Sequence, residues 1–198
     1  MNLRVQPVLE EMARHRVQFD EFCRSLNPQE LEAPVPGSPW TVHGYIAHIC
    51  TIDSLIAPWF SAMVGISDVP PPGVAPPQPF DIDEWNEAMV AARVGTPLAG
   101  LLDEATRHRE RYVRAVSAMT DAHLDANVPF GGDRKVIDLP ATTVRLDQLL
   151  WAIALHDPTH VQDIVRAIPG RADNPSVKEW LAAVDFSRVP AQVAARRV

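Results

Sequence analysis

The residues most suited to chemistry are His156 and His160, which lie four positions apart in the segment HDPTH. Side chains at i and i+4 project from the same face of a helix, so two imidazole nitrogens could bind one metal ion. Both histidines also continue an apolar stripe with Leu149, Ile153 and Ile164. A buried histidine must satisfy its polar nitrogens. The alternative is therefore a pair of core histidines that hydrogen-bond to backbone groups or carboxylates.

Pro158 lies between the two histidines. A proline inside a helix removes one hydrogen bond and clashes with the preceding turn, at a cost of about 3 kcal/mol. One possibility is a kink that tilts His160 relative to His156. The other is a full break, with Asp157 as the N-cap of a new helix, which would weaken the argument for a histidine pair.

His48 is the third candidate ligand, on the apolar stripe of another predicted helix. A helical bundle brings the inward faces of its second and fourth helices together, so His48, His156 and His160 could share one site. Three imidazoles that leave a coordination position open are typical of catalytic metal sites. Such a donor set suits several divalent ions, with zinc or nickel favoured over iron or manganese.

The other histidines and a group of arginines suggest less. His108 falls on the apolar face of its predicted helix and could line a cavity, whereas His15 and His123 have polar neighbours and are expected to be solvated. Four arginines are predicted to form a solvated helix face: Arg107, Arg109, Arg111 and Arg114. They would matter for function only if one reached a pocket and held a substrate carboxylate.

Other catalytic motifs are absent from the sequence. There is no glycine-rich phosphate loop, no G-x-S-x-G and no C-x-x-C, and neither His156 nor His160 follows a glutamate by three residues as in a di-iron bundle. Cys23 and Cys50 are too few for a disulfide framework. A metal site built from histidines is the remaining candidate.

Helical periodicity dominates the chain and predicts the elements that must position these residues. The predicted long helices span residues 3–26, 39–65, 98–116 and 146–168. Ser38 and Thr96 are the expected N-caps of the second and third of these helices. Shorter elements are a helix capped by Asp81 or Asp83, a hairpin around Gly131 and Gly132, and a helix around Trp180. The proline-rich residues 68–80 are expected to be extended. This pattern predicts an all-α four-helix bundle with short extended connections.

Composition narrows the class of protein. The chain has 198 residues, 46% hydrophobic and 22% charged, and a net charge of -7, which predicts one globular domain and argues against a general nucleic-acid binder. The longest apolar run, 149–155, is far shorter than the roughly 20 residues of a membrane helix. Charged residues occupy the N-terminus where a signal peptide is apolar. We therefore expect a cytoplasmic protein with neither nucleic acid nor membrane as a partner.

Three segments together resemble the DinB/YfiT-like family of metal-binding four-helix bundles. They are Trp40-Thr41-Val42 leading to His48, Asp83-Glu84-Trp85-Asn86, and residues 149–161, which end in the H-x-x-x-H pattern. Pro158 departs from the family, whose last helix runs straight through this point. The resemblance assigns residues 1–170 to the bundle and leaves 171–198 as a C-terminal extension.

The resemblance implies an up-down-down-up bundle, commonly a homodimer, in which His48, His156 and His160 bind a divalent metal. Asn86 and His108 become candidates for lining the pocket. Relatives include thiol-dependent S-transferases and a mycothiol-dependent maleylpyruvate isomerase, in which the metal lowers the pKa of the thiol. The isomerase branch has a glutamate in its last-helix motif, so two histidines there fit the S-transferase branch better.

The expected partners are therefore a small-molecule substrate and a low-molecular-weight thiol. Only two of the 18 basic residues are lysines, a bias that favours a GC-rich source and hence mycothiol over bacillithiol. Two other functions stay open. The same three histidines could activate water in a metal-dependent hydrolase, or they could be core residues of a non-enzymatic ligand-binding or stress-response bundle.

Overall fold

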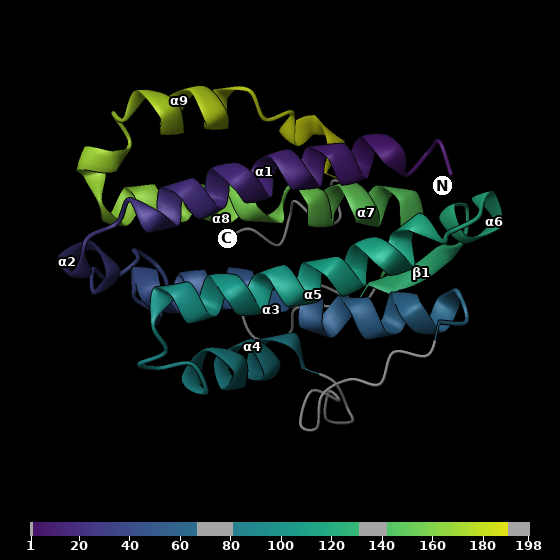
Figure 1. The fold of residues 1–198 in the computed structure, drawn as a ribbon, viewed down its shortest axis with the longest axis horizontal. Helices are drawn as coiled ribbons and strands as arrows, with labels where there is room; N and C mark the ends of the chain where they lie inside the picture. The colour runs from purple at the N-terminus through teal and green to yellow at the C-terminus, as the bar shows by residue number, and fades with distance from the viewer. Residues whose placement is uncertain (1, 67–80, 131–141, 190–198) are drawn as a thin grey trace.

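The computed structural model describes residues 2–66, 81–130 and 142–189. Its four long helical segments are α1 (Gln6–Arg24), α3 (Val42–Met63), α5 (Leu98–Ser117) and the consecutive pair α7 (Leu146–Ala154) and α8 (His156–Ala167). In Figure 1, α3 and α5 run in one direction, whereas α1 and the α7–α8 pair run in the other. The predicted all-α, up-down-down-up bundle is confirmed.

The shorter elements lie at the ends of this bundle and along two of its sides (Figure 1). They are α2 (Pro28–Leu31), α4 (Ile82–Ala91), α6 (Asp121–Leu124), β1 (Asn127–Phe130), β2 (Thr142–Arg145), α9 (Pro175–Ala182) and the 3-10 turns Pro169–Arg171 and Phe186–Arg188. The two strands pair antiparallel, with Asn127 opposite Arg145. This confirms the strands of the predicted hairpin. Its turn at Gly131 and Gly132 and the proline-rich connection 68–80 lie outside the described residues.

The starts of two helices differ from the prediction. Thr41, not Ser38, caps α3 by accepting a hydrogen bond from the Gly44 amide. The helix begins late because the preceding residues form a closed turn, in which Pro34 and Thr41 make an isolated antiparallel bridge. Thr96 does not cap α5, whose N-cap position is taken by the next residue, a proline.

The core consists of two apolar clusters that follow one another along the bundle. The first lies around α8 and α9 and includes Phe19, Ile46, Leu101, Leu155 and Trp180. The second lies around α7 and includes Met12, Phe60, Tyr112, Leu150 and Ile153. Charged side chains occupy the level between the two clusters. We call this group, made of Arg16, Asp53, Arg109 and Asp157, the central polar layer.

The C-terminal extension packs onto α1 through a buried histidine. The indole nitrogen of Trp180 in α9 donates a 2.9 Å hydrogen bond to Nδ1 of His15. His15 is fully buried, with its Nε2 3.1 Å from Oε1 of Glu11, so the prediction that it is solvated was wrong. The polar neighbours in sequence gave no sign that α9 folds back and covers this side chain.

Helix α3 is the most apolar of the long helices that the structure describes. By length and composition alone it could cross a membrane, and 61% of its most apolar window is buried inside the bundle. It packs mainly against α5. Burial within the bundle accounts for its hydropathy, because a core helix is apolar on most of its faces.

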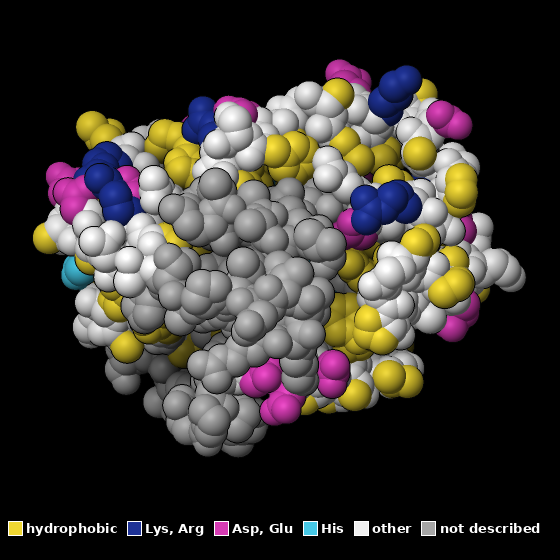
Figure 2. Space-filling view, turned by 180° about the vertical axis from the view of Figure 1, so that it is seen from behind, with side chains coloured by type: hydrophobic (Ala, Val, Ile, Leu, Met, Phe, Trp, Pro, Cys, Tyr) yellow, Lys and Arg dark blue, Asp and Glu magenta, His cyan; other side chains and the backbone are white. Residues whose placement is uncertain are grey.

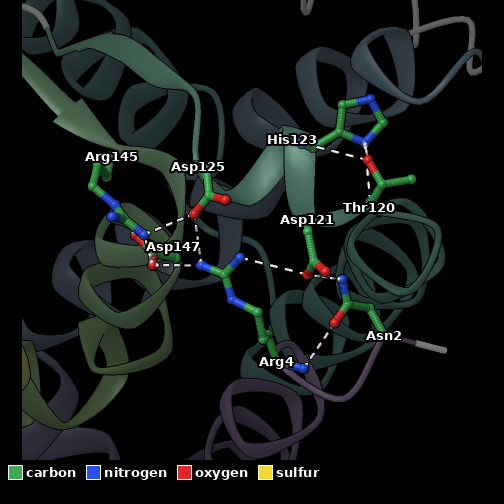
Figure 3. Close-up of polar contacts among 8 residues, drawn as sticks. All are labelled: Asn2, Arg4, Thr120, Asp121, His123, Asp125, Arg145 and Asp147. Carbon is green, nitrogen blue, oxygen red and sulfur yellow. Dashed lines mark hydrogen bonds and ion pairs between the residues drawn. The ribbon is translucent and has the colours of Figure 1, made fainter.

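The described surface carries charges of both signs. On the face opposite to the view of Figure 1, Lys and Arg side chains lie in small groups with acidic side chains nearby (Figure 2). At the start of α1, Arg4 contacts Asp121, Asp125 and Asp147, and Arg145 joins the same network (Figure 3). Among the described residues on the face of Figure 2, no extended basic surface is seen, in keeping with the net charge of -7.

Candidate metal centre

His48 of α3 and His156 and His160 of α8 converge on one point inside the bundle. One potential ligand atom from each histidine lies within 4.8 Å of the other two. The ring centroid of His48 is 5.3 Å from that of His156 and 5.0 Å from that of His160. The ring centroids of His156 and His160 are 4.4 Å apart. The structure therefore brings together the three residues singled out from the sequence.

The last long helical segment is interrupted between α7 and α8, just before His156, rather than smoothly kinked. Leu155 separates the two helices with φ -94° and ψ 5°, and its carbonyl accepts hydrogen bonds from both the amide and the hydroxyl of Thr159. Pro158 has no amide hydrogen to continue the ladder. The interruption precedes both histidines, which lie together on α8 with ring centroids 4.4 Å apart. The predicted alternative of a break at Asp157, which would separate the two histidines, is therefore not observed.

Burial keeps His48 and His156 neutral. It lowers the pKa of His48 to about 3, with a further decrease from nearby His160 and a smaller opposing effect of the Asn86 side chain. Burial, together with the neighbouring imidazoles, also lowers the pKa of His156 well below its ordinary value. A neutral imidazole has a free lone pair, which is the form that binds metals.

Some ring nitrogens of the cluster also lack hydrogen-bond partners among the described residues. Nδ1 of His48 and of His156 is buried without a hydrogen bond, and Nδ1 of His160 has only a 3.5 Å contact with a carboxylate of its own helix. An unsatisfied buried polar group costs about 1–3 kcal/mol. Such groups are unfavourable as plain core residues, and three imidazole donors fit a divalent cation of the zinc or nickel type.

A carboxylate of the same helix stands behind His160. Oδ2 of Asp163 lies 3.5 Å from Nδ1 of His160 and accepts a 3.3 Å hydrogen bond from the hydroxyl of Tyr45. Burial and the neighbouring carboxylate raise the pKa of Tyr45 to about 12, so the hydroxyl remains a donor. Carboxylates in this position commonly orient a metal-binding histidine. Sequence reasoning missed Asp163, although its i+3 spacing from His160 was a usable signal.

Aromatic rings form one wall beside the cluster. The ring of Trp40 is 5.3 Å from that of His48 and 5.7 Å from that of Tyr45, and Tyr45 is 5.5 Å from His160. Both aromatic side chains are half-buried. They supply an apolar surface next to the histidines, and the motif that begins at Trp40 was the sequence signal for it.

Of the two residues predicted to line the pocket, Asn86 lies beside the histidine cluster and His108 contacts a carboxylate instead. Asn86 of α4 lies beside the cluster, as its effect on the pKa of His48 shows. His108 of α5 instead contacts a carboxylate one turn earlier, with Nε2 3.3 Å from Oε1 of Glu104. Glu104 also pairs with Arg93, at 2.5 Å. The structure thus places His108 in an ion-pair network between α4 and α5.

The central polar layer lies next to His156. Nε of Arg109 is 2.5 Å from Oδ2 of Asp53, and Nε of Arg16 is 3.2 Å from Oδ2 of Asp157. Only 9% of Arg109 is exposed, so the prediction that it belongs to a solvated face was wrong. Its guanidinium turns inward because Asp53, a single carboxylate within the apolar α3, supplies the opposite charge. Asp157 is not a helix cap, contrary to one of the two predictions for this segment.

A surface cavity of about 380 Å³ opens between α1 and α5. Its lining residues are Arg16, Thr106, Arg109, Glu110, Val113 and Arg114. Of the four arginines considered for a pocket, Arg109 and Arg114 therefore reach this cavity, whereas the three histidines belong to α3 and α8.

Comparison with known proteins agrees with this architecture. The chain resembles the crystal structure of a mycothiol-dependent maleylpyruvate isomerase with a TM-score of 0.57 and 13% sequence identity. The match covers 83% of this chain and 63% of that protein, and at this identity it shows the fold alone. No curated protein matches the sequence. The sequence profile of the DinB superfamily matches residues 11–164, which contain all three histidines, and the chain therefore belongs to the DinB superfamily.

Proposed function

We propose that this protein is a metal-dependent enzyme that transfers a low-molecular-weight thiol to an electrophilic small molecule. His48, His156 and His160 would hold the divalent cation. The observation that carries the proposal is the convergence of three imidazoles, one buried and two half-buried, with ligand atoms within 4.8 Å of one another. A bundle core has no structural need for three converging imidazoles, of which the Nδ1 atoms of His48 and His156 lack hydrogen-bond partners among the described residues.

When bound, the cation would lower the pKa of a thiol and so favour the thiolate at neutral pH. The thiol proton leaves to solvent, the sulfur bonds to the electrophilic carbon, and the leaving group departs with its bonding electron pair. The protein's own residues orient the reactants. Asp163 holds the ring of His160, Asn86 lies beside His48, and the Trp40 ring limits the access of water on one side.

Two observations support a thiol as the cosubstrate. The similar fold of a mycothiol-dependent enzyme makes mycothiol the first choice. The last-helix motif has histidine at both positions, which favours transfer over the isomerase chemistry implied by a glutamate there. Mycothiol and an electrophilic small molecule are thus the proposed partners, with bacillithiol as the second thiol.

The test is a thiol-transfer assay with zinc-reconstituted protein, mycothiol and a bimane halide as the fluorogenic electrophile. We expect conjugate formation that depends on both metal and thiol and that is lost in His156→Ala. His108→Ala is the matched control, because it removes another buried histidine outside the cluster. Turnover of activated esters without any thiol would instead identify the hydrolase. Failure of the protein to retain metal would favour the non-enzymatic bundle.

A further inference from the structure

Each of the four long helical segments contributes one charge to the central polar layer. Arg16 comes from α1, Asp53 from α3, Arg109 from α5 and Asp157 from α8. Asp157 contacts both arginines: Oδ1 lies 3.3 Å from Nη2 of Arg16 and 3.6 Å from Nη2 of Arg109. Both aspartates are 1% exposed. The layer therefore ties all four segments together at one level of the bundle.

Stability alone gives a weak reason for such a layer. Removal of four charges from water is unfavourable, and well-packed apolar side chains often replace buried ion pairs without loss of stability. Apolar clusters lie directly on both sides of the layer, so an uninterrupted apolar core would fit the same helices. Several polar atoms of the layer, including Arg16 Nη1 and Asp53 Oδ1, also lack hydrogen bonds. The layer is costly, and this points to a role other than stability.

The position of Asp157 indicates that role. It follows His156 directly and precedes Pro158, in the one turn where the α7–α8 backbone ladder is interrupted. A continuous helix would set the direction of the His156 side chain through its hydrogen bonds, but Leu155 ends α7 and Pro158 cannot donate. The ion pairs of Asp157 with α1 and α5 supply a side-chain anchor at this turn.

We propose that the ion pairs of Asp157 with Arg16 and Arg109 form a positioning device within the central polar layer: they hold the first turn of α8 so that His156 lies in register with His48 and His160. This inference rests on the proposed metal site. Asp157 and the two arginines are positioning residues, since none of them belongs to the group of potential ligands. Loosening the anchor would let the His156 ring move away from the other two, so that a cation would lose one of three donors.

The experiment measures zinc affinity by competition with a chromophoric chelator, together with unfolding of the metal-free protein in denaturant. Asp157→Asn keeps the shape of the side chain and removes its charge, and we expect it to weaken zinc binding roughly tenfold or more, the usual range for residues that orient ligands. Arg16→Lys keeps the charge but loses the forked contact. We expect a smaller loss of affinity with a fold that is retained.

Asp53→Asn is the matched control, because Asp53 is equally buried and also pairs with Arg109 but lies on α3, five residues after His48. It should lower the stability of the metal-free protein and leave zinc affinity within about twofold of wild type. Cobalt-loaded samples give a second readout, since the ligand-field spectrum should change in Asp157→Asn and not in Asp53→Asn.

Equal zinc affinities in wild type, Asp157→Asn and Arg16→Lys would overturn the positioning role and leave the metal site intact. Equal losses in Asp157→Asn and Asp53→Asn would also overturn it, because they would reflect general loosening of the bundle. Failure of the wild type itself to bind zinc would overturn the metal site and the positioning role together.

Discussion

Among the described residues, two of the networks of arginine and aspartate have similar contacts and different surroundings. At the start of α1, Arg4 lies 3.0 Å from both Asp125 and Asp147, and the Asp125 side chain is 56% exposed (Figure 3). In the central polar layer, Asp53 and Asp157 are 1% exposed at comparable distances from their arginines. Water competes with and screens the first network, whereas the second has lost its hydration. The expected contributions of the two networks to stability therefore differ because of burial and not because of contact length.

The largest effect is expected in the buried network. Arg109→Ala leaves the carboxylate of Asp53 buried without its partner, and removal of one member of a buried pair costs about 3–5 kcal/mol. The measurement is the free energy of unfolding in urea. The double variant Arg109→Met/Asp53→Leu should recover much of this loss. A loss below about 1 kcal/mol in the single variant would mean that the layer behaves like the exposed network.

A half-buried ion pair offers an intermediate case with a pH signature. The hydrogen bond from His108, together with that from Arg93, lowers the pKa of Glu104 to about 2 against the opposing effect of burial. Because the folded pKa lies below the unfolded value, the contribution is present above about pH 4.5 and is lost as the pH falls towards 2. It should amount to at most about 3 kcal/mol. Glu104→Gln should flatten the acid limb of stability against pH, and an unchanged limb would contradict the assignment.

A neutral buried hydrogen bond should matter less than a buried charge. Trp180→Phe removes the donor to Nδ1 of His15, and an unsatisfied buried acceptor costs about 1–3 kcal/mol. Thermal unfolding followed by circular dichroism measures the change. Truncation before α9 should have an effect at least as large, since it also uncovers His15. Full stability of the truncated chain would show that the extension does not belong to the folded core.

The smallest effect is expected at the surface. Arg4→Ala removes three contacts with carboxylates, and we expect the urea midpoint to remain close to that of wild type because exposed pairs contribute little. The small difference should shrink further at 1 M salt, where the screening length is about 3 Å. A marked loss of stability, insensitive to salt, would break the contrast between the two networks.

Sequence reasoning succeeded where a periodic pattern is sufficient. The four long helices, their order and the convergence of His48 with His156 and His160 follow from apolar stripes and i, i+4 spacing. It failed where a distant segment decides the outcome. Arg109 is buried because it pairs with Asp53 on another helix. His15 is buried because Trp180 of the C-terminal extension packs onto it and donates a hydrogen bond.

The helix break before His156 shows a further limit. Pro158 signals an interruption, but the local sequence does not distinguish a kink from a break. The answer depends on contacts of the neighbouring Asp157 with α1 and α5, which are tertiary. Helix caps also depend on more than the local sequence. Asp81, one of the two predicted candidates, caps α4, whereas the closed turn before Thr41 displaces the expected cap of α3.

The most direct test of the central claim is the metal content of untagged protein by elemental mass spectrometry. Wild type, His156→Ala and His108→Ala are purified identically and reconstituted with zinc. The account predicts about one equivalent of divalent metal, as for a single three-histidine site, in wild type and His108→Ala, and its loss in His156→Ala. Wild type without metal after reconstitution, or His156→Ala with undiminished metal, would contradict it.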